Sequence, residues 1–256
     1  MKRMVATGLG VLALSTLAAA DVDDIASFVD APRTFNDFPD SNLFFESNFA
    51  AGTLSIIEND YGQGGFANRH IAWWGDAANT KVDFDYDDDF KASMVLTVKQ
   101  ADSVGNVEAG FQADLFGFGL FGVLTASGEI AAFGSVLPFH SFGTGLYDVG
   151  DELALEMIHH SGAGENMMPF STMEYRYNNL TQNTGWISSG EIDFTTTEGG
   201  IPSAFDAFFG AGAQINQPDP QLGAVDIQFN KIQIVPAPGT LALAGCAGLV
   251  ALRRRR

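Results

Sequence analysis

Five aspartates lie within the seven residues 83–89. On a β-strand, Asp83, Asp85 and Asp87 would share one face, because successive side chains point to opposite sides. Carboxylate oxygens are ligands that Ca²⁺ prefers, and crowded carboxylates repel one another unless a cation neutralises them. The EF-hand pattern is absent, since Asp88 stands where that loop needs glycine. We therefore expect either a calcium site at Asp83, Asp85 and Asp87 or a solvated acidic surface.

Three tryptophans, Trp73, Trp74 and Trp186, supply aromatic planes of the kind that stack on sugar rings. The polar residues near the first two are Asn68, Arg69, Asp76 and Asn79. Adjacent residues of a strand point to opposite faces, so at least one of Trp73 and Trp74 is expected in the core. We predict glycan contacts at these tryptophans, with core packing as the alternative.

The charge of the chain excludes some classes of partner. Six of the 13 basic residues lie in residues 1–20 and 236–256, so residues 21–235 hold 7 basic and all 31 acidic residues, a formal charge of −24. Such a surface repels nucleic acid, and we expect no nucleic-acid partner. The single cysteine excludes an intramolecular disulfide and a cysteine-based zinc site.

Residues 21–235 consist of short runs in which apolar and polar residues alternate, and this pattern is typical of half-buried β-strands. We expect strands at residues 43–49, 53–57, 81–86, 92–99, 107–114, 121–125, 129–133, 152–158, 172–177, 186–194 and 225–235. A change of phase at Asn230-Lys231 predicts a bulge in the last of these. A short surface helix is expected at 204–211. The pattern predicts one all-β domain, a two-sheet antiparallel jelly-roll sandwich.

The succession of segments from residue 92 to 235 resembles the concanavalin A-like lectin and glucanase jelly roll. The segments that carry the resemblance are Glu108-Ala109-Gly110-Phe111, Gly128-Glu129-Ile130, residues 146–157 and Val225-Asp226-Ile227-Gln228-Phe229. The resemblance extends over about 140 residues. It implies the fold more than a function.

Retaining glucanases of that fold carry Glu-x-Asp-x-Glu on one strand, and the segment Glu191-Ile192-Asp193-Phe194-Thr195 is similar to it. The resemblance implies a nucleophile at Glu191 and a helper at Asp193, but Thr195 stands at the position of the general acid/base. A hydroxyl cannot replace that carboxyl group. We therefore expect that the protein has no catalytic residues and is not an enzyme.

The N-terminus has the three parts of a secretory signal peptide. Lys2 and Arg3 precede an apolar stretch that ends in Ala18-Ala19-Ala20. We expect residues 1–20 to be a signal helix that signal peptidase removes, and the rest to be exported.

The C-terminus has a proline-containing motif, an apolar run and a basic block, in this order. The motif is Val235-Pro236-Ala237-Pro238-Gly239-Thr240, and the basic block is Arg253, Arg254, Arg255 and Arg256. This tail resembles the sorting signal of PEP-CTERM proteins, with Ala237 in place of the usual glutamate. The resemblance implies an exosortase-type membrane transpeptidase as partner. The four arginines would stop transfer of a short transmembrane helix, and an ordinary tail anchor is the alternative.

These features together predict three parts: a signal peptide at 1–20, a β-sandwich at 21–235 and a sorting or anchor segment at 236–256. We expect an exported bacterial protein, anchored in the membrane or at the cell surface, that is non-catalytic and binds extracellular polysaccharide. One alternative is a glycoside hydrolase of the same fold. The other is a purely structural or adhesive protein of the envelope.

Overall fold

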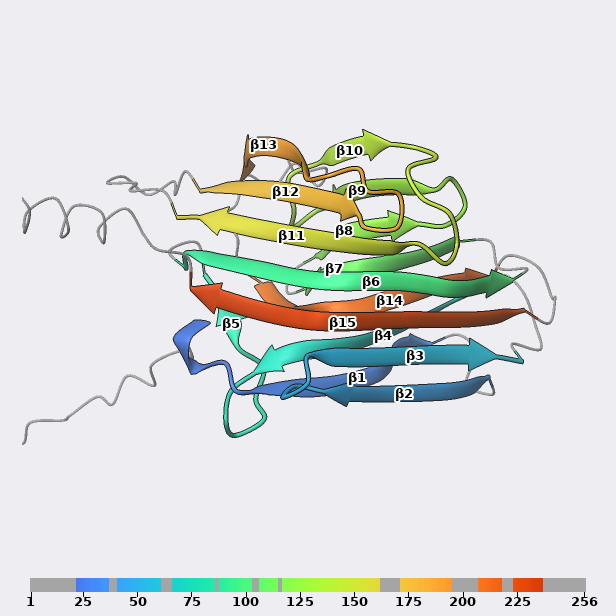
Figure 1. The fold of residues 1–256 in the computed structure, drawn as a ribbon. Coiled ribbons are helices and arrows are strands. Elements are labelled where there is room, and N and C mark those ends of the chain that lie inside the picture. The colour runs from blue at the N-terminus through green and yellow to red at the C-terminus, as the bar shows by residue number, and fades with distance from the viewer. Residues whose placement is uncertain are drawn as a thin grey trace, which may run out of the picture.

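The computed structural model describes residues 22–36, 41–60, 66–85, 88–102, 106–114, 117–161, 171–194, 207–217 and 223–236. These residues form two antiparallel sheets stacked face to face, with a single 3₁₀ turn, η1 (Val22–Asp24), before the first strand (Figure 1). The predicted all-β, two-sheet antiparallel sandwich is therefore confirmed. The expected signal helix and C-terminal helix lie outside the described residues.

The eight-stranded sheet has the order β1-β4-β14-β7-β8-β9-β10, and β5 pairs with β14 beside this path. Its strands are β1 (Ser27–Asn36), β4 (Phe66–Gly75), β5 (Asp83–Phe84), β7 (Asn106–Asp114), β8 (Phe118–Leu124), β9 (Glu129–Gly134), β10 (His140–Gly143) and β14 (Ala207–Gln217). Every neighbouring pair is antiparallel.

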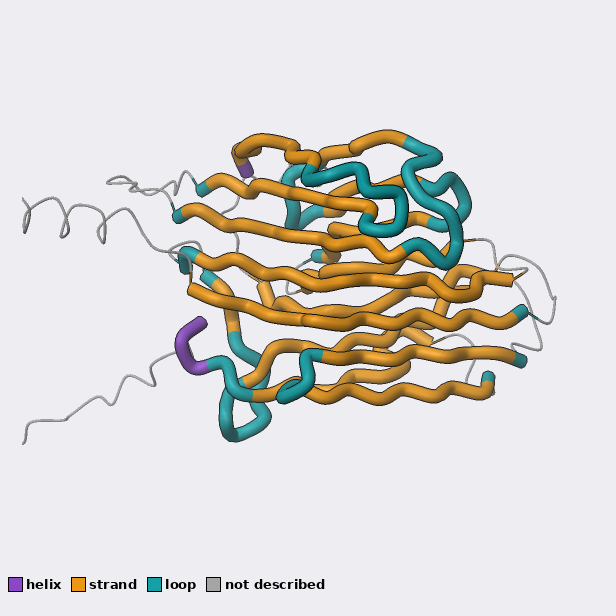
Figure 2. Tube along the Cα trace, viewed as in Figure 1, coloured by secondary structure: helices purple, strands orange, loops and turns teal. Residues whose placement is uncertain are grey.

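The seven-stranded sheet has the order β13-β12-β11-β6-β15-β3-β2. Its strands are β2 (Asn42–Asn48), β3 (Thr53–Asn59), β6 (Phe90–Asp102), β11 (Glu152–His160), β12 (Thr172–Asn179), β13 (Ile187–Asp193) and β15 (Ala224–Pro236). Strands of the two sheets run roughly along the same direction, and Figure 2 shows that loops join them mainly at the two ends.

Most expected strands are present, but one of them is much shorter than expected and an expected helix was wrong. The strand expected at 81–86 is reduced to the two residues of β5. The surface helix expected at 204–211 does not form where the structure describes this segment: Ala207–Gln217 is β14, a strand with neighbours on both sides. The bulge predicted in β15 is confirmed, because the pairing with β6 shifts between Asn230 and Gln233 and Lys231 has a φ of 53°.

Aromatic side chains fill the space between the sheets. Trp74 lies 4.8 Å from Phe209 and 6.2 Å from Phe111, measured between ring centroids, and Phe84 packs edge-on against Phe209 at 5.6 Å. All four side chains are almost completely buried. Burial of large aromatic rings is the main source of stability in such a core.

A buried hydrogen-bond network centred on one carboxyl group joins the two sheets. Glu58 of β3 and His70 of β4 are both fully buried, and His70 Nε2 lies 3.0 Å from Glu58 Oε2. The backbone N–H of Arg33 donates to His70 Nδ1, so the imidazole proton is on Nε2 and is donated to the carboxylate. Ser41 Oγ and Asn68 Nδ2 donate to Glu58 Oε1 at 2.5 and 2.6 Å.

These hydrogen bonds decide the charge of the carboxyl group. Burial raises the pKa of Glu58, but the hydrogen bonds from His70, Ser41 and Asn68 outweigh it and hold the pKa below the ordinary value of 4.5. A lowered pKa in the folded state adds stability above the unfolded-state pKa. That contribution is lost as the pH falls through the folded-state pKa.

We predict that Glu58→Ala lowers the free energy of unfolding by about 3 kcal/mol at pH 7, because it leaves buried donors without an acceptor. The difference from the wild type should shrink as the pH falls below about 4.5, where the wild type loses this stability. Urea unfolding between pH 3 and 7 measures both effects. The exposed Glu152→Ala is the control, and equal losses in the two variants would contradict the prediction.

Candidate functional site

Side chains of β4 alternate between the core and the outer face of the eight-stranded sheet. Ala72 and Trp74 belong to the hydrophobic core, and His70 bonds to the other sheet. Arg69, Ile71 and Trp73 therefore point to the outer face, because their parity is opposite. Among the described residues of β4, β7, β8, β9 and β14, the interior strands of this sheet, Arg69 is the only arginine.

Arg69 reaches across β14 to the strand beyond it. Its Nη1 lies 2.8 Å from Asp114 Oδ2, and its Nε lies 3.3 Å from Gln112 Oε1, both on β7. The pairing register places Gln214 of β14 beside Arg69 and Gly210 beside Gln112. Gly212, which lies between these two positions, has no side chain in the path of the arginine.

The guanidinium group is buried although it lies on an outer face. Arg69 is 7 % exposed, and its Nη2 has no hydrogen-bond partner among the residues that the structure describes. Burial lowers the pKa of Arg69, and the hydrogen bond and charge of Asp114 oppose this effect. An arginine remains charged at any ordinary pH, so Nη2 is a buried, charged donor without a hydrogen-bond partner among the described residues.

Aromatic rings surround this arginine. Its Cζ lies 4.7 Å from the ring centroid of Phe118 and 5.9 Å from that of Trp73. Lys81 Nζ lies 4.0 Å from the ring of Phe208 and 5.4 Å from that of Trp73. Both cations therefore share Trp73, and the outer face combines cations with apolar planes.

Two carboxyl groups of β7 lie on the same face. Glu108 accepts hydrogen bonds from Asn106 and Asn216, yet burial raises its pKa more than these bonds and the charge of Arg69 lower it. Glu108 and Asp114 are six residues apart on one strand, which is roughly 20 Å. Glycosidases need two carboxyl groups about 5 to 9.5 Å apart, so these two cannot act as such a pair.

The three tryptophans predicted as glycan contacts occupy different places. Trp73 lies on the outer face beside Arg69 and is 4 % exposed, whereas Trp74 is a core residue. Trp186 is 50 % exposed and precedes β13, the edge strand of the other sheet. The structure therefore does not bring the three together, and Trp73 is the member that shares a face with Arg69.

The structure describes two of the three predicted calcium ligands. Asp83 lies in β5, Asp85 follows it, and Asp87 lies outside the described residues. In the described ranges no group of three histidine, cysteine or acidic side chains is arranged to hold a metal ion. Calcium at this segment stays a prediction.

The termini contribute little to the described structure. Val235 and Pro236 are the last residues of β15, and residues 237–240 and Arg253–Arg256 lie outside the described part, as do residues 1–20. The part that is described contains no helix with the length and hydropathy of a membrane span. The acidic pair Glu191 and Asp193 lies on the edge strand β13, and Thr195 is not described.

Sequence reasoning placed Arg69 near Trp73 but missed its partners. Gln112 and Asp114 are 43 and 45 residues further along the chain. The signal available was the alternation of Gly210 and Gly212, which on a strand leaves two successive positions of one face without side chains. We expected a helix there, so this signal was not used.

No protein-family model and no curated protein matches the sequence. Among solved structures, the chain is similar to alginate lyase A1-II′, a member of polysaccharide lyase family 7, at 12 % identity and a TM-score of 0.47, covering 76 % of this chain and 83 % of that one. It is similar to the marine PL-14 alginate lyase from Aplysia kurodai at 7 % identity and a TM-score of 0.47, covering 84 % and 99 %.

A third similar structure is the GH131 β-glucanase catalytic domain from Podospora anserina, at 9 % identity and a TM-score of 0.43, covering 84 % of this chain and 87 % of that one. These neighbours correct our expectation that the protein is not an enzyme, because they are themselves polysaccharide lyases and a glucanase. At such low identities we transfer no residue role or substrate from them.

We predict that Gly212→Ala destabilises the sheet that carries this site. A Cβ at Gly212 would lie 2.3 Å from the backbone oxygen of His70, so the strands must move apart. We expect a loss of about 3 kcal/mol in the free energy of unfolding. Gly190→Ala, where a Cβ meets open space but φ is +69°, is the control and should lose about 1 kcal/mol. Chemical denaturation measures both losses. Equal losses of unfolding free energy in Gly212→Ala and Gly190→Ala would contradict the close approach of β14 and β4.

Proposed function

We propose that the domain is carbohydrate-active and binds a polysaccharide on the outer face of its eight-stranded sheet. The observation that carries the proposal is the buried guanidinium of Arg69, whose Nη2 has no partner among the described residues. An unpaired buried donor costs free energy, and a ligand oxygen that accepts its hydrogen bond recovers that cost.

The groups around Arg69 suit a sugar. Asp114 offers an acceptor and Arg69 a donor side by side, which matches two neighbouring hydroxyl groups of a sugar ring. The rings of Phe118 and Phe208, which are partly exposed, supply the apolar planes against which the C–H groups of a sugar ring pack.

Charge favours an uncharged polysaccharide. On this face, Arg69 and Lys81 are outnumbered by the carboxyl groups of Asp83, Glu108, Asp114 and Glu129, and residues 21–235 carry a formal charge of −24. A polyanion would have to approach this field without a net positive site to receive it. A neutral glycan avoids that repulsion.

Cleavage of the bound polysaccharide is a second candidate, which the carboxyl group of Glu108 favours. Its raised pKa keeps it protonated to a higher pH than an ordinary glutamate. It can therefore act as a proton donor to a leaving oxygen.

We further propose that the domain works outside the cytoplasm, as a surface or matrix protein processed by an exosortase-type enzyme. The support is the signal-peptide pattern of residues 1–20 and the order of motif, apolar run and arginines in 235–256. Intact mass of the envelope-associated protein tests this, because retention of Arg253–Arg256 argues against processing.

We predict that Arg69→Ala weakens binding of a neutral β-glucan or galactomannan at least tenfold, because the variant loses both the donor and the partner of Asp114. Isothermal titration calorimetry with the full chain measures this, with alginate as the anionic comparison. Arg176→Ala, on the other sheet and paired with Glu174, is the matched control. The proposal fails if Arg69→Ala binds as the wild type does, or if only alginate binds.

If Glu108 donates a proton, Glu108→Gln lowers the rate of oligosaccharide release about 10²-fold or more while binding is retained. The wild-type rate should fall as the pH rises through the raised pKa of Glu108, because the donor is then deprotonated. Release is followed by chromatography of the products. A wild-type rate of oligosaccharide release in Glu108→Gln would contradict the catalytic role of Glu108. The proposed polysaccharide binding is tested separately by Arg69→Ala.

A further inference from the structure

Part of the edge of β15 is not covered by any described strand. β15 pairs with β6 from Ala224 to Pro236. On its other side it pairs with β3 only as far as Phe229, which lies opposite Leu54. Figure 1 shows β15 extending beyond the end of β3 on this side. Residues 230–236 therefore present a strand edge of the kind that can pair with another strand.

A turn closes one end of this edge. The backbone C=O of Gly52, in the turn after β2, accepts a hydrogen bond of 2.9 Å from the N–H of Ile232. Backbone groups of successive residues point to opposite sides of an antiparallel strand, so the N–H and C=O of Ile234 also point to the open side. No described residue forms a backbone hydrogen bond with Ile234 on that side. Pro236, the last residue of β15, has no N–H to offer.

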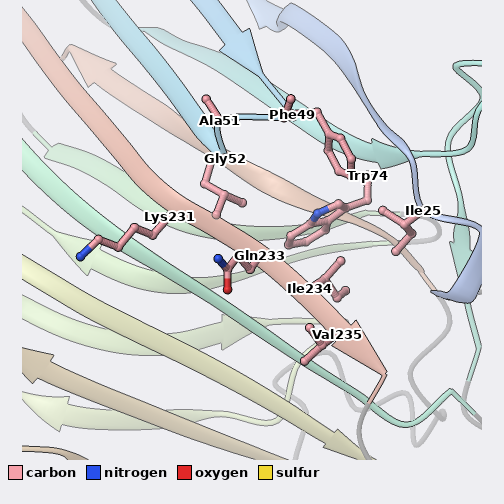
Figure 3. Close-up of a pocket in the computed structure, with 11 residues that line it drawn as sticks. Ile25, Phe49, Ala51, Gly52, Trp74, Lys231, Gln233, Ile234 and Val235 are labelled. Atoms are coloured by element: carbon pink, nitrogen blue, oxygen red, sulfur yellow. The ribbon is translucent and has the colours of Figure 1, made fainter.

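A hollow of about 270 Å³ lies along this edge (Figure 3). Its inner lining includes Trp74, which is almost completely buried, and the partly buried Ile25. Its outer side is open to solvent, because Gln233 and Val235 are exposed. An added strand needs such surroundings, since its side chains point alternately toward the core and toward water.

The two ends of the hollow carry opposite charges. Lys231, at the bulge of β15, is exposed at one end. The other end has Ile25, which Figure 3 shows near Ile234. Ile25 directly follows the exposed Asp23 and Asp24 of η1, a turn that contacts β15. A strand antiparallel to β15 would run from the aspartates to the lysine, and its complement is therefore basic at the N-terminal end and acidic at the C-terminal end.

We propose that this edge binds a short extended peptide of another protein, which adds a strand antiparallel to β15 in line with β3. The central residue of the peptide exchanges two backbone hydrogen bonds with Ile234. That residue is apolar, because opposite residues of a strand pair share a face and Ile234 packs against the core. The site lies on the other sheet from Arg69 and does not depend on glycan binding.

A second copy of this chain suits the edge less well. The open edge is short, because the turn at Gly52 closes one end and Pro236 lacks a donor at the other. Residues 21–235 of each copy carry a formal charge of −24, so two copies repel each other. A peptide with basic residues avoids this repulsion.

The test uses the full chain and a fluorescent, end-blocked heptapeptide, Lys-Lys-Val-Leu-Val-Glu-Glu, whose binding is measured by fluorescence anisotropy. The control peptide Glu-Glu-Val-Leu-Val-Lys-Lys has the same composition and the opposite charge order. We expect the control to bind about fivefold more weakly. Absence of binding by the first peptide, or equal affinities of the two, overturns the proposal.

Modified peptides test the backbone pairing without any change to the protein. Methylation of the nitrogen of the central leucine removes the donor to Ile234 and should weaken binding about tenfold. Methylation of the nitrogen of the next valine is the matched control, because that N–H points away from β15. Equal losses for the two modified peptides overturn the addition of a strand.

Hydrogen exchange followed by nuclear magnetic resonance locates the peptide. Exchange of the Ile234 amide should slow about tenfold in the complex, because its N–H becomes hydrogen-bonded. Lys231→Glu should weaken binding about tenfold, whereas Lys99→Glu, at an exposed position of β6, should bind as the wild type does. Binding with unchanged exchange at Ile234, or equal effects of the two variants, overturns the site. Slower exchange at rising protein concentration without peptide assigns the edge to a second copy and also overturns the proposal.

Discussion

The side chain of Arg69 spans an entire strand, and this is feasible because β14 has glycine at the two outer-face positions that the arginine passes. Gly210 and Gly212 of β14 have no side chains between Arg69 and its partners on β7. The same glycines let the backbones approach so closely that a Cβ would collide. The path of the arginine and the burial of its charge both depend on this one constraint, and so does Nη2, a donor without a partner in the part of the chain that the structure describes. Larger side chains there would separate the strands and hold the guanidinium in solvent.

The side chains on the inner face of β4 stabilise the fold instead. Asn68 and His70 flank Arg69 in sequence, but they point inward and bind Glu58 of the other sheet. Alternation along β4 thus divides adjacent residues between a structural network and a candidate binding face. The network also fixes the bulged part of β1, because the backbone of Arg33 donates to His70. We infer that the outer site is held rigidly, since its strand is bonded on three sides.

Local patterns were sufficient for much of the fold. Strands with one polar face, such as β6, β11 and β12, were predicted close to their bounds, and the bulge in β15 followed from a change of phase. Four strands were not predicted: β1, β4, β10 and β14. In β14, alanine, phenylalanine and glycine give no polar alternation. The candidate site could not be predicted from the sequence, for another reason. Arg69 and Asp114 meet through the register of β4, β14 and β7, and no spacing along the chain encodes that register. The aspartate-rich segment and the tryptophans were predicted as binding sites from their residue types alone.

We propose that Arg69 binds a neutral glycan through Nη2, which has no partner among the described residues. The most direct measurement is the nuclear magnetic resonance signal of the Arg69 side-chain N–H groups during titration with a neutral oligosaccharide. The account predicts that this signal shifts with the same saturation curve as the backbone signals of Gln112 and Asp114. A signal of Arg69 that stays unchanged while the oligosaccharide saturates another surface would contradict it.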